Sequence, residues 1–320
     1  MGKRDILTKQ YLSQNAIFAD AFNFYLFNGE KVIKPEDLQE RDVNELAVTE
    51  KLGNVLATQK MRDVLKVCAI KQNDFATLVL LGIEGQASVH YAMPVRNYLY
   101  DALNYSEQVE NIRKLHKERR DLEGAELLSG FSKNDHVLPV ITLCICFGRK
   151  KWDGPRKLSE MFGVVDPRIK DYVNDYRLNL ITPDEIDNFE KFASELGLLL
   201  EFIHNSDDMK TLRDIMNSRK EYQSVDVNTV NMINSYTKAN IRIDNEVGGE
   251  INMCKAIQDM VEEGRNEGRN EGRNEGRNEG ADMLAALLQK LEPGTEDYNL
   301  AINGTSDDRD RLFKKYAIGE

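Results

Sequence analysis

Two acidic residues and a glutamine at the ends of two neighbouring apolar segments are the strongest candidates for chemistry in this sequence. Asp63 begins one segment, and Glu84 and Gln86 end the next, with Gly85 between them. If the segments pair as strands, both acids meet at one sheet edge, Glu84 and Gln86 share a face, and the carbonyl of Gly85 stays accessible. Two carboxylates and a carbonyl oxygen are the hard ligands that Mg²⁺ or Mn²⁺ prefers. The alternative is that the acids are solvated charges, which are common at strand ends.

A divalent metal at this edge would suit the hydrolysis of a phosphate ester. It would offset the repulsion between the two carboxylates, lower the pKa of a bound water and brace a phosphate oxygen. It would also allow an acidic protein to approach a polyanion. The chain carries 43 Lys and Arg against 54 Asp and Glu, a net charge of −11. That balance disfavours proteins that coat nucleic acid through charge alone.

The apolar pattern indicates which elements position these residues. Residues 63–70 and 75–84 have the composition of strands, and the four polar residues 71–74 between them predict an antiparallel hairpin. Residues 137–147 predict a further buried strand. Apolar residues recur at helical spacing in 18–27, 94–116 and 189–204, and Asn28-Gly29 ends the first of these helices. Strands separated by helices up to about residue 205 predict an α/β or α+β fold, with a mixed sheet flanked by helices.

Length and composition restrict the class of protein. The 320 residues suffice for one large or two modest domains, with 41% hydrophobic and 30% charged residues. No run approaches the roughly 18 apolar residues of a membrane-spanning helix, and the first residues do not resemble a secretory signal. Four cysteines do not suggest a disulfide framework, and no nucleotide-binding glycine motif occurs. We therefore expect a cytoplasmic protein with no membrane contact and no organic cofactor.

The chain beyond residue 205 divides into three parts. Residues 206–262 are polar and predict a helical connector, and residues 263–280 repeat Glu-Gly-Arg-Asn four times before a final Glu-Gly. As a helix the repeat stacks like charges at i,i+4, and each Gly costs about 1 kcal/mol relative to Ala. We expect a flexible spacer, or a marginal helix that needs a partner. Residues 281–320 predict a small helical segment whose apolar stretch 283–291 must bury its face, plausibly against a second copy, so we expect a homodimer or homo-oligomer.

Several short motifs, none specific alone, occur in an order that resembles a known family. They are Ala19-Asp20-x-Phe22-Asn23, Arg62-Asp63-Val-Leu-Lys66, Gly82-Ile-Glu-Gly-Gln86, Met93-Pro-Val-Arg96, Tyr100-Asp-Ala-Leu, Leu138-Pro-Val-Ile141 and Trp152-Asp-Gly-Pro-x-x-Leu158. The set is similar to the recombination-promoting nucleases, a transposase-like branch of the PD-(D/E)XK nuclease superfamily. The resemblance covers roughly residues 15–205, and a repeat rich in Glu, Gly and Arg is also typical of these proteins. It implies a restriction-endonuclease-like domain over residues 1–205.

The resemblance assigns roles to individual residues. It implies that Asp63 and Glu84 are the metal-binding acids, and that Asp20 matches the upstream helix acid, a less certain third catalytic acid that would bind metal or water. Gln86 stands where the superfamily has lysine, and this branch often uses glutamine there. An amide takes no proton at neutral pH, so the base would be metal-bound hydroxide or a substrate phosphate oxygen, while Gln86 orients water or phosphate. Gly85 stands where relatives often carry Asn or His, which puts the efficiency of catalysis in doubt.

Basic residues provide the candidate contacts to DNA. Arg96, on the helix after the hairpin, is a candidate phosphate clamp, and the alternative is an exposed arginine paired with a nearby acid. Two further basic groups, 113–120 and 149–157, are candidate contacts to the DNA backbone, although charge runs are commonly solvated faces. Their named members are Arg113, Lys114, Lys117, Arg149, Lys150 and Lys151. Trp152 in the second group either stacks on a base or anchors its loop, and Cys144 and Cys146 are expected in the core.

These features together predict a Mg²⁺-dependent endonuclease that cleaves DNA, with Mn²⁺ as a possible substitute. The resemblance implies a role in recombination, mobile elements or defence against foreign DNA. The alternative is a non-catalytic nucleic-acid-binding or regulatory protein on a nuclease scaffold, which Gly85 and the net charge favour. A third hypothesis is that RNA is the substrate.

Overall fold

The structure is a computed structural model that describes residues 2–40, 44–48, 57–61, 63–72, 75–243, 246 and 248–319. Arg62, part of one sequence motif, and the turn residues 73 and 74 lie outside the described residues. The chain forms two compact units, Met1–Cys254 and Lys255–Glu320, and each is described by itself. Within the described ranges, no helix is both long enough and apolar enough to cross a membrane.

A mixed β-sheet is the centre of the first unit. Among the described residues it has five strands in the order β1-β4-β5-β6-β7. The strands are β1 (Leu38–Glu40), β4 (Val64–Gln72), β5 (Phe75–Gln86), β6 (Val140–Cys146) and β7 (Asn179–Ile181). β1, β4 and β5 are antiparallel neighbours, whereas β5, β6 and β7 are parallel. The prediction of a mixed α/β fold is therefore confirmed.

The predicted hairpin is present, and its strands are longer than expected. β4 and β5 pair from Val64↔Ile83 to Gln72↔Phe75. Two smaller antiparallel ladders lie outside the central sheet. One joins β2 (Asn44–Val48) to β3 (Ala57–Met61), and the other joins β8 (Val225–Asp226) to β9 (Glu250–Ile251).

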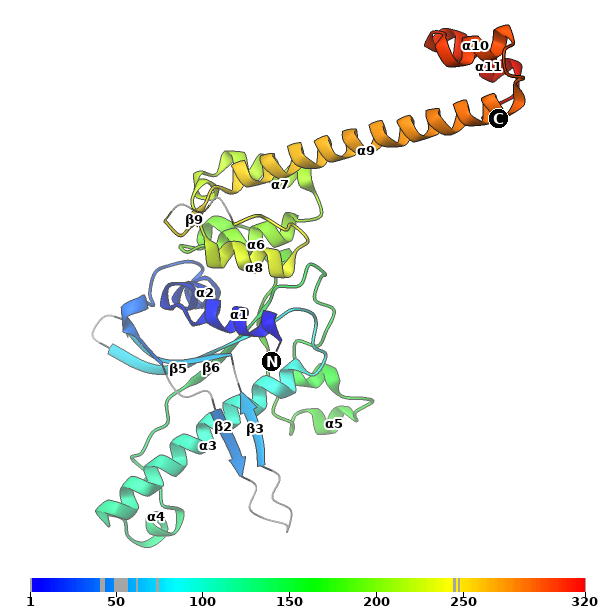
Figure 1. The fold of residues 1–320 in the computed structure, drawn as a ribbon. Helices are drawn as coiled ribbons and strands as arrows, with labels where there is room; N and C mark the ends of the chain where they lie inside the picture. The colour runs from blue at the N-terminus through cyan, green and yellow to red at the C-terminus, as the bar shows by residue number, and fades with distance from the viewer. Residues whose placement is uncertain are drawn as a thin grey trace. The chain divides into compact units, whose positions relative to one another are not determined.

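Helices cover both faces of the sheet. α1 (Lys3–Ser13) contacts β4 and β5 on one face (Figure 1). α2 (Asn15–Phe27) and α8 (Val227–Tyr236) pack against α1, and α6 (Leu196–Asn205) packs against both of them. α3 (Met93–Arg119) contacts β6 on the other face. α2 turns fully buried Phe18 and Phe22 to the core, and Asn28 ends it in a left-handed conformation with φ of 54°. The expected Asn-Gly stop is thus present.

α3 changes its surroundings along its length. Its buried residues Met93, Asn97, Tyr100 and Asn104 recur at three- and four-residue spacing and end at Asn104. The remainder projects past the sheet and meets the segment around α4 (Gly124–Ser129) (Figure 1). Shorter elements complete the first unit. They are η1 (Pro35–Asp37), η2 (Leu158–Met161), α5 (Pro167–Lys170), η3 (Pro183–Glu185), η4 (Phe189–Lys191), α7 (Met209–Ser218) and η5 (Lys220–Gln223).

The prediction of one helix over 189–204 is wrong. The chain forms η4, then an irregular stretch, and only then α6. The stretch is held open because Asp20 accepts hydrogen bonds from the backbone of Ala193 and Ser194. These amides are therefore not used in a continuous helix. The compact unit also continues past residue 205, where we expected the nuclease-like domain to end, through α7 and α8.

The second unit consists of helices. Its described elements are α9 (Met253–Lys290), α10 (Glu296–Asn303) and α11 (Ser306–Lys315). The repeat 263–280 is helical within α9 and its side chains are exposed. The apolar face that follows is covered within the unit, because Leu287 and Leu291 pack with Ala301 and Leu312. The expectation that this face needs a second copy of the chain is therefore corrected.

Candidate active site

The register of the central hairpin places the two candidate acids opposite each other. Val64 pairs with Ile83, so Asp63 lies one residue before β4, across from Glu84 on β5. Glu84 also pairs with Cys144 on β6, which places it inside the sheet.

Asp63 is fixed by the backbone of the neighbouring strand. Its Oδ2 accepts a hydrogen bond of 2.7 Å from the N–H of Gly85. The carboxylate thereby extends the β4–β5 ladder past the first residue of β4. Burial raises the pKa of Asp63 above its ordinary value, against the opposing effects of the Gly85 hydrogen bond and the positive charges of Arg96 and Lys9. The fold thus holds this acid where ionisation is less favourable than in water.

Glu84 is buried and paired with an arginine of α3. Its side chain is 1% exposed, and Oε2 lies 3.3 Å from Nη2 of Arg96, whose side chain is 35% exposed. Arg96 Nε also donates to the hydroxyl of Tyr100 over 2.8 Å, and the guanidinium lies 5.6 Å from the Tyr100 ring centre. Burial lowers the pKa of Arg96, but Glu84 and Tyr100 outweigh it, so the net shift is upward. The sequence left two hypotheses for Arg96, a phosphate clamp or an arginine paired with a nearby acid, and the structure shows the pairing with an acid.

Tyr100 is a part of the site that the sequence alone did not reveal. Burial raises its pKa, and the negative charge of Glu84 raises it further. The tyrosine is 2% exposed and lies one helical turn after Arg96. The i,i+4 spacing of Arg96 and Tyr100 was the signal available in the sequence. The side chain supports both the arginine and the buried glutamate.

The structure gives a steric reason for glycine at position 85. A Cβ there would lie 2.5 Å from Cγ2 of Thr8 and 3.0 Å from Cδ1 of Leu12, both on α1. Gly85 thus faces α1, whereas Glu84 faces α3 and, by strand alternation, the half-buried Gln86 shares its side. The carbonyl of Gln86 accepts a bond of 2.8 Å from the N–H of Phe147. An Asn or His at position 85 would require α1 to move.

Asp20 does not join this group through any hydrogen bond to the described residues. It is 4% exposed, and its Oδ1 accepts from the N–H of Ala193 over 2.8 Å. Its Oδ2 accepts from the N–H and the hydroxyl of Ser194 over 2.8 and 2.5 Å. Both oxygens therefore serve the loop before α6. We correct its prediction as a catalytic acid to a structural role.

One basic group lies away from the hairpin end, and the other follows β6 directly, where Gly148 adjoins Ala87 just past the end of β5. Arg113, Lys114 and Lys117 are exposed on the last turns of α3, and 17 residues separate Arg96 from Arg113, about 26 Å at 1.5 Å per helical residue. In the other group, Arg149 pairs with Asp207 and Lys150 and Lys151 are exposed.

Trp152 anchors its loop and is not available for base stacking. It is 4% exposed, and its Nε1 donates to the carbonyl of Gly154 over 2.9 Å. It packs with Met93, Cys144 and Cys146 in one apolar cluster. The two cysteines are buried free thiols, as the sequence predicted for small core residues.

The donor set at the hairpin end is chemically suited to a hard cation. Within the described part of the chain, no group of three or more His, Cys, Asp or Glu is arranged to hold a metal. A metal would therefore depend on Asp63, Glu84 and the carbonyl of Gly85, with the remaining positions filled by water or substrate. Glu84 already has the guanidinium of Arg96 beside it, so a metal ion there would share this carboxylate with the arginine.

No family model, curated protein or solved structure matches this chain significantly. Its function is therefore inferred from the residues at the end of the hairpin and on α3.

Proposed function

We propose that the chain is a metal-dependent DNA endonuclease with a restriction-endonuclease-like fold. The observation that carries the proposal is the position of Asp63 opposite Glu84 at the end of a buried hairpin, beside Arg96. Mg²⁺ is the proposed metal, and Mn²⁺ a substitute. The resemblance of the sequence motifs to recombination-promoting nucleases supports DNA as the substrate, and a role in recombination, mobile elements or defence.

Each residue of the site has a separate task in this proposal. A metal held by Asp63 and Glu84 would polarise the phosphate and make water more acidic. The N–H of Gly85 orients the Asp63 carboxylate, and Arg96 orients that of Glu84. Gln86 lies on the Glu84 side of β5, where its amide orients water or the scissile phosphate. Because Arg96 is partly exposed, it is also placed to donate to a phosphate oxygen.

The exposed basic groups are the proposed contacts to the DNA backbone. The cations on the last turns of α3 lie about 26 Å along the helix from Arg96. This separation corresponds to seven or eight base pairs at roughly 3.4 Å each. A duplex lying along α3 would therefore contact Arg113, Lys114 and Lys117 well outside the cleavage site. Arg149, Lys150 and Lys151 are proposed as further contacts.

Self-association is proposed through the second unit. Leu287 and Leu291 of α9 are buried against Ala301 and Leu312, and we assign the contact with another copy to the exposed repeat 263–280. A dimer would bring two candidate sites to one duplex.

A second candidate function is a non-catalytic nucleic-acid-binding protein on the same scaffold. The observation that favours it is the ion pair between Glu84 and Arg96, because the arginine already neutralises one of the two candidate metal ligands. Under this hypothesis the pair is structural, and binding of nucleic acid needs no metal.

Incubation of the full chain with supercoiled plasmid separates the two functions. With Mg²⁺ or Mn²⁺ we expect nicking that EDTA abolishes and that Asp63→Asn and Glu84→Gln reduce by at least about a hundredfold. Glu107→Gln, which neutralises an exposed carboxylate on α3, is the matched control and should retain the activity. Binding without cleavage in any metal would support the second function. A parallel reaction with RNA identifies the polymer.

A further inference from the structure

A cavity of about 690 Å³ lies at the C-terminal end of α3. One side is lined by residues of the end of α3 and its C-cap, and the other by three residues of the segment that carries α4. The first set is Glu110, Arg113, Lys114, His116, Lys117 and Arg120, and the second is Leu122, Leu127 and Gly130. Cavities that bind small ligands have volumes of about 300–1,000 Å³. The site is separate from the hairpin end, because Arg113 lies 17 residues beyond Arg96 on the same helix.

The cavity has a strong positive charge in an acidic protein. Its lining has one carboxylate, Glu110, against four cations, Arg113, Lys114, Lys117 and Arg120. Glu110 pairs with Arg113 at 3.0 Å. Among the described residues, the side chains of Lys114, Lys117 and Arg120 make no hydrogen bond or ion pair. Three cations therefore face the cavity without a protein counter-ion.

Ordinary helix electrostatics explain only part of this arrangement. Cations in the last turn favour the helix dipole, and Lys117 lies in that turn of α3. Arg113 and Lys114 lie further back. Lys117 is also four residues from Arg113 and three from Lys114 and Arg120, spacings at which like charges destabilise a helix. An anion in the cavity would offset this repulsion.

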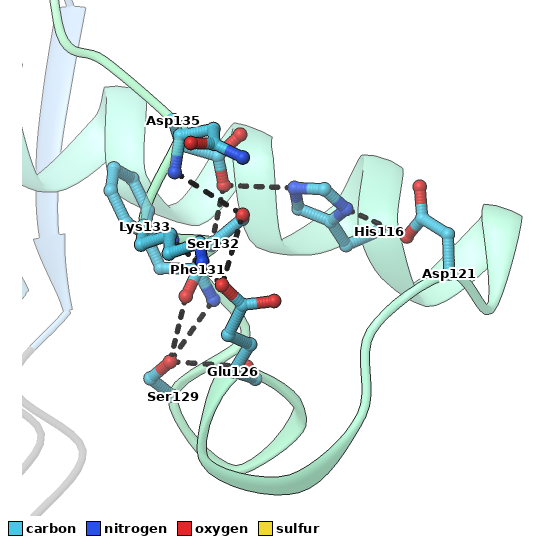
Figure 2. A network of polar contacts seen from close by, with 9 residues as sticks. His116, Asp121, Glu126, Ser129, Phe131, Ser132, Lys133 and Asp135 are labelled. Carbon is cyan, nitrogen blue, oxygen red and sulfur yellow. Dashed lines mark hydrogen bonds and ion pairs between the residues drawn. The ribbon is translucent and has the colours of Figure 1, made fainter.

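The far wall of the cavity is fixed to α3 by a network of polar contacts (Figure 2). His116 lies between two carboxylates, with Nδ1 2.7 Å from Asp121 and Nε2 2.8 Å from Asp135. These two bonds hold both ends of the α4 segment against the helix. Both ring nitrogens of His116 are occupied by these two carboxylates, so the imidazole is not free to bind a ligand in the cavity.

Arg113 is positioned by the absence of a side chain at Gly130. A Cβ at Gly130 would lie 2.9 Å from both Cγ and Nε of Arg113, and Gly130 has φ of 67°. The arginine therefore packs directly on the backbone of the wall. Leu122 is half-buried and Leu127 is 63% exposed, so the same cavity offers an apolar surface next to its cations.

We propose that this cavity binds a nucleotide. Arg113, Lys114, Lys117 and Arg120 take the phosphates, and Leu122 and Leu127 take the base. The nucleotide is either free in solution or one unpaired residue of a nucleic-acid strand, since both carry the same groups. The inference does not rest on cleavage at the hairpin end.

Calorimetric titration of the full chain in EDTA tests the proposal. The probes are ATP, inorganic tripolyphosphate and a six-nucleotide single strand with a 5′-phosphate. We expect Lys114→Gln with Lys117→Gln to weaken ATP or oligonucleotide binding by about tenfold or more, because charge-assisted contacts are lost. Lys210→Gln with Lys220→Gln removes the same charge from exposed sites on and after α7 and should change affinity less than about twofold.

Leu127→Ser tests the proposed apolar contact with the base separately from the contacts with the phosphates. We expect it to weaken ATP but not tripolyphosphate, and circular dichroism of each variant checks that the fold is intact. Tighter binding of ATP would identify a free nucleotide, and tighter binding of the oligonucleotide would identify a strand. The proposal is overturned if the double lysine variant binds like the native chain, if Leu127→Ser has no effect, or if no probe binds at millimolar concentration. Because EDTA removes metal from the hairpin end, none of these results depends on nuclease activity.

Discussion

The ion pair between Glu84 and Arg96 allows the sharpest test of the site. Arg96→Met removes the cation and its hydrogen bond to Tyr100, and leaves a carboxylate that is 1% exposed. Removal of one partner of a fully buried pair costs about 3–5 kcal/mol. Because the Arg96 side chain is 35% exposed, water replaces part of the lost contact. We therefore expect a loss of about 2–3 kcal/mol at pH 7, or a decrease in Tm of about 4–12 °C for a unit of this size.

Thermal unfolding followed by calorimetry measures this loss, with two comparisons. The double variant Arg96→Met, Glu84→Gln should recover most of the stability, because the buried carboxylate that lost its arginine is then also neutral. Arg113→Met is the matched control on the same helix. Its partner Glu110 is half exposed, so that pair should contribute no more than about 1 kcal/mol.

Mg²⁺ then distinguishes a metal site from a purely structural pair. If Asp63 and Glu84 bind the ion, Mg²⁺ supplies the missing cation and should raise the Tm of Arg96→Met more than that of the native chain. At a concentration one hundred times the dissociation constant, the stabilisation is about 2.7 kcal/mol. Adding Asp63→Asn should remove the response. The reasoning is refuted if Arg96→Met is no less stable than Arg113→Met, or if Mg²⁺ acts equally on all variants.

Four further changes test other parts of the structure. Burial raises the pKa of Asp63, so the ionised carboxylate destabilises the fold above that pKa, and this penalty disappears below the pKa of the unfolded chain, about 3.9. Asp63→Asn should therefore raise the Tm at pH 7 by an amount that vanishes near pH 4. A difference in Tm that does not depend on pH would contradict this. Gly85→Ala should cost about 1–3 kcal/mol through its contact with α1, and an unchanged Tm would show that the helix moves freely. Hydrogen bonds to two aspartates raise the pKa of His116, so its contribution to stability is complete below about pH 6.5 and is lost as the pH rises through the higher pKa of the folded state. An NMR titration of the imidazole and the Tm of His116→Gln from pH 6 to 9 measure this. An imidazole that titrates at its ordinary pKa would contradict the expectation. Deletion of residues 263–280 removes about five whole helical turns, so the residues that follow keep their orientation around the helix axis. We expect weaker self-association and an unchanged Tm of the first unit. Equal sedimentation of the deleted and full-length proteins would show that the repeat does not mediate self-association.

The sequence predicted those elements whose apolar pattern is long enough to be distinctive. The β4–β5 hairpin and α3 are of this kind, since each has many residues in one periodicity. β1 and β7 were missed because three residues show no usable period. The helix predicted over 189–204 was wrong because its break depends on Asp20, which is 174 residues away from Ser194 along the chain. A local pattern does not contain such a contact.

The candidate site likewise has features that the sequence could predict and features that it could not. The hairpin register follows from the two strand patterns, so the positions of Asp63 and Glu84 relative to each other could be predicted. The partner of Glu84 could not, because it depends on how α3 lies against the sheet. Asp20 was misassigned for the same reason, since an acid on a helix face is equally suited to a metal or to a loop. The room for a side chain at position 85 was also hidden, because it is set by α1, more than 70 residues earlier in the chain.

Stability alone gives no reason for the charges at the end of the hairpin. Burial makes ionised Asp63 unfavourable, and buried ion pairs such as Glu84–Arg96 are often replaced by apolar residues without loss of stability. Asp63 and Glu84 are thus two acids whose burial does not favour stability, and they lie near each other beside the partly exposed Arg96. Charges retained at such a cost are typical of sites that act on a ligand. Under the non-catalytic function Glu84→Met with Arg96→Met should leave both stability and nucleic-acid binding unchanged, whereas the nuclease proposal expects a variant that is as stable as the native chain but no longer cleaves. The two functions thus agree on the stability of this variant and differ in plasmid cleavage: under the nuclease proposal the native chain nicks DNA and the variant does not, and under the non-catalytic function neither does.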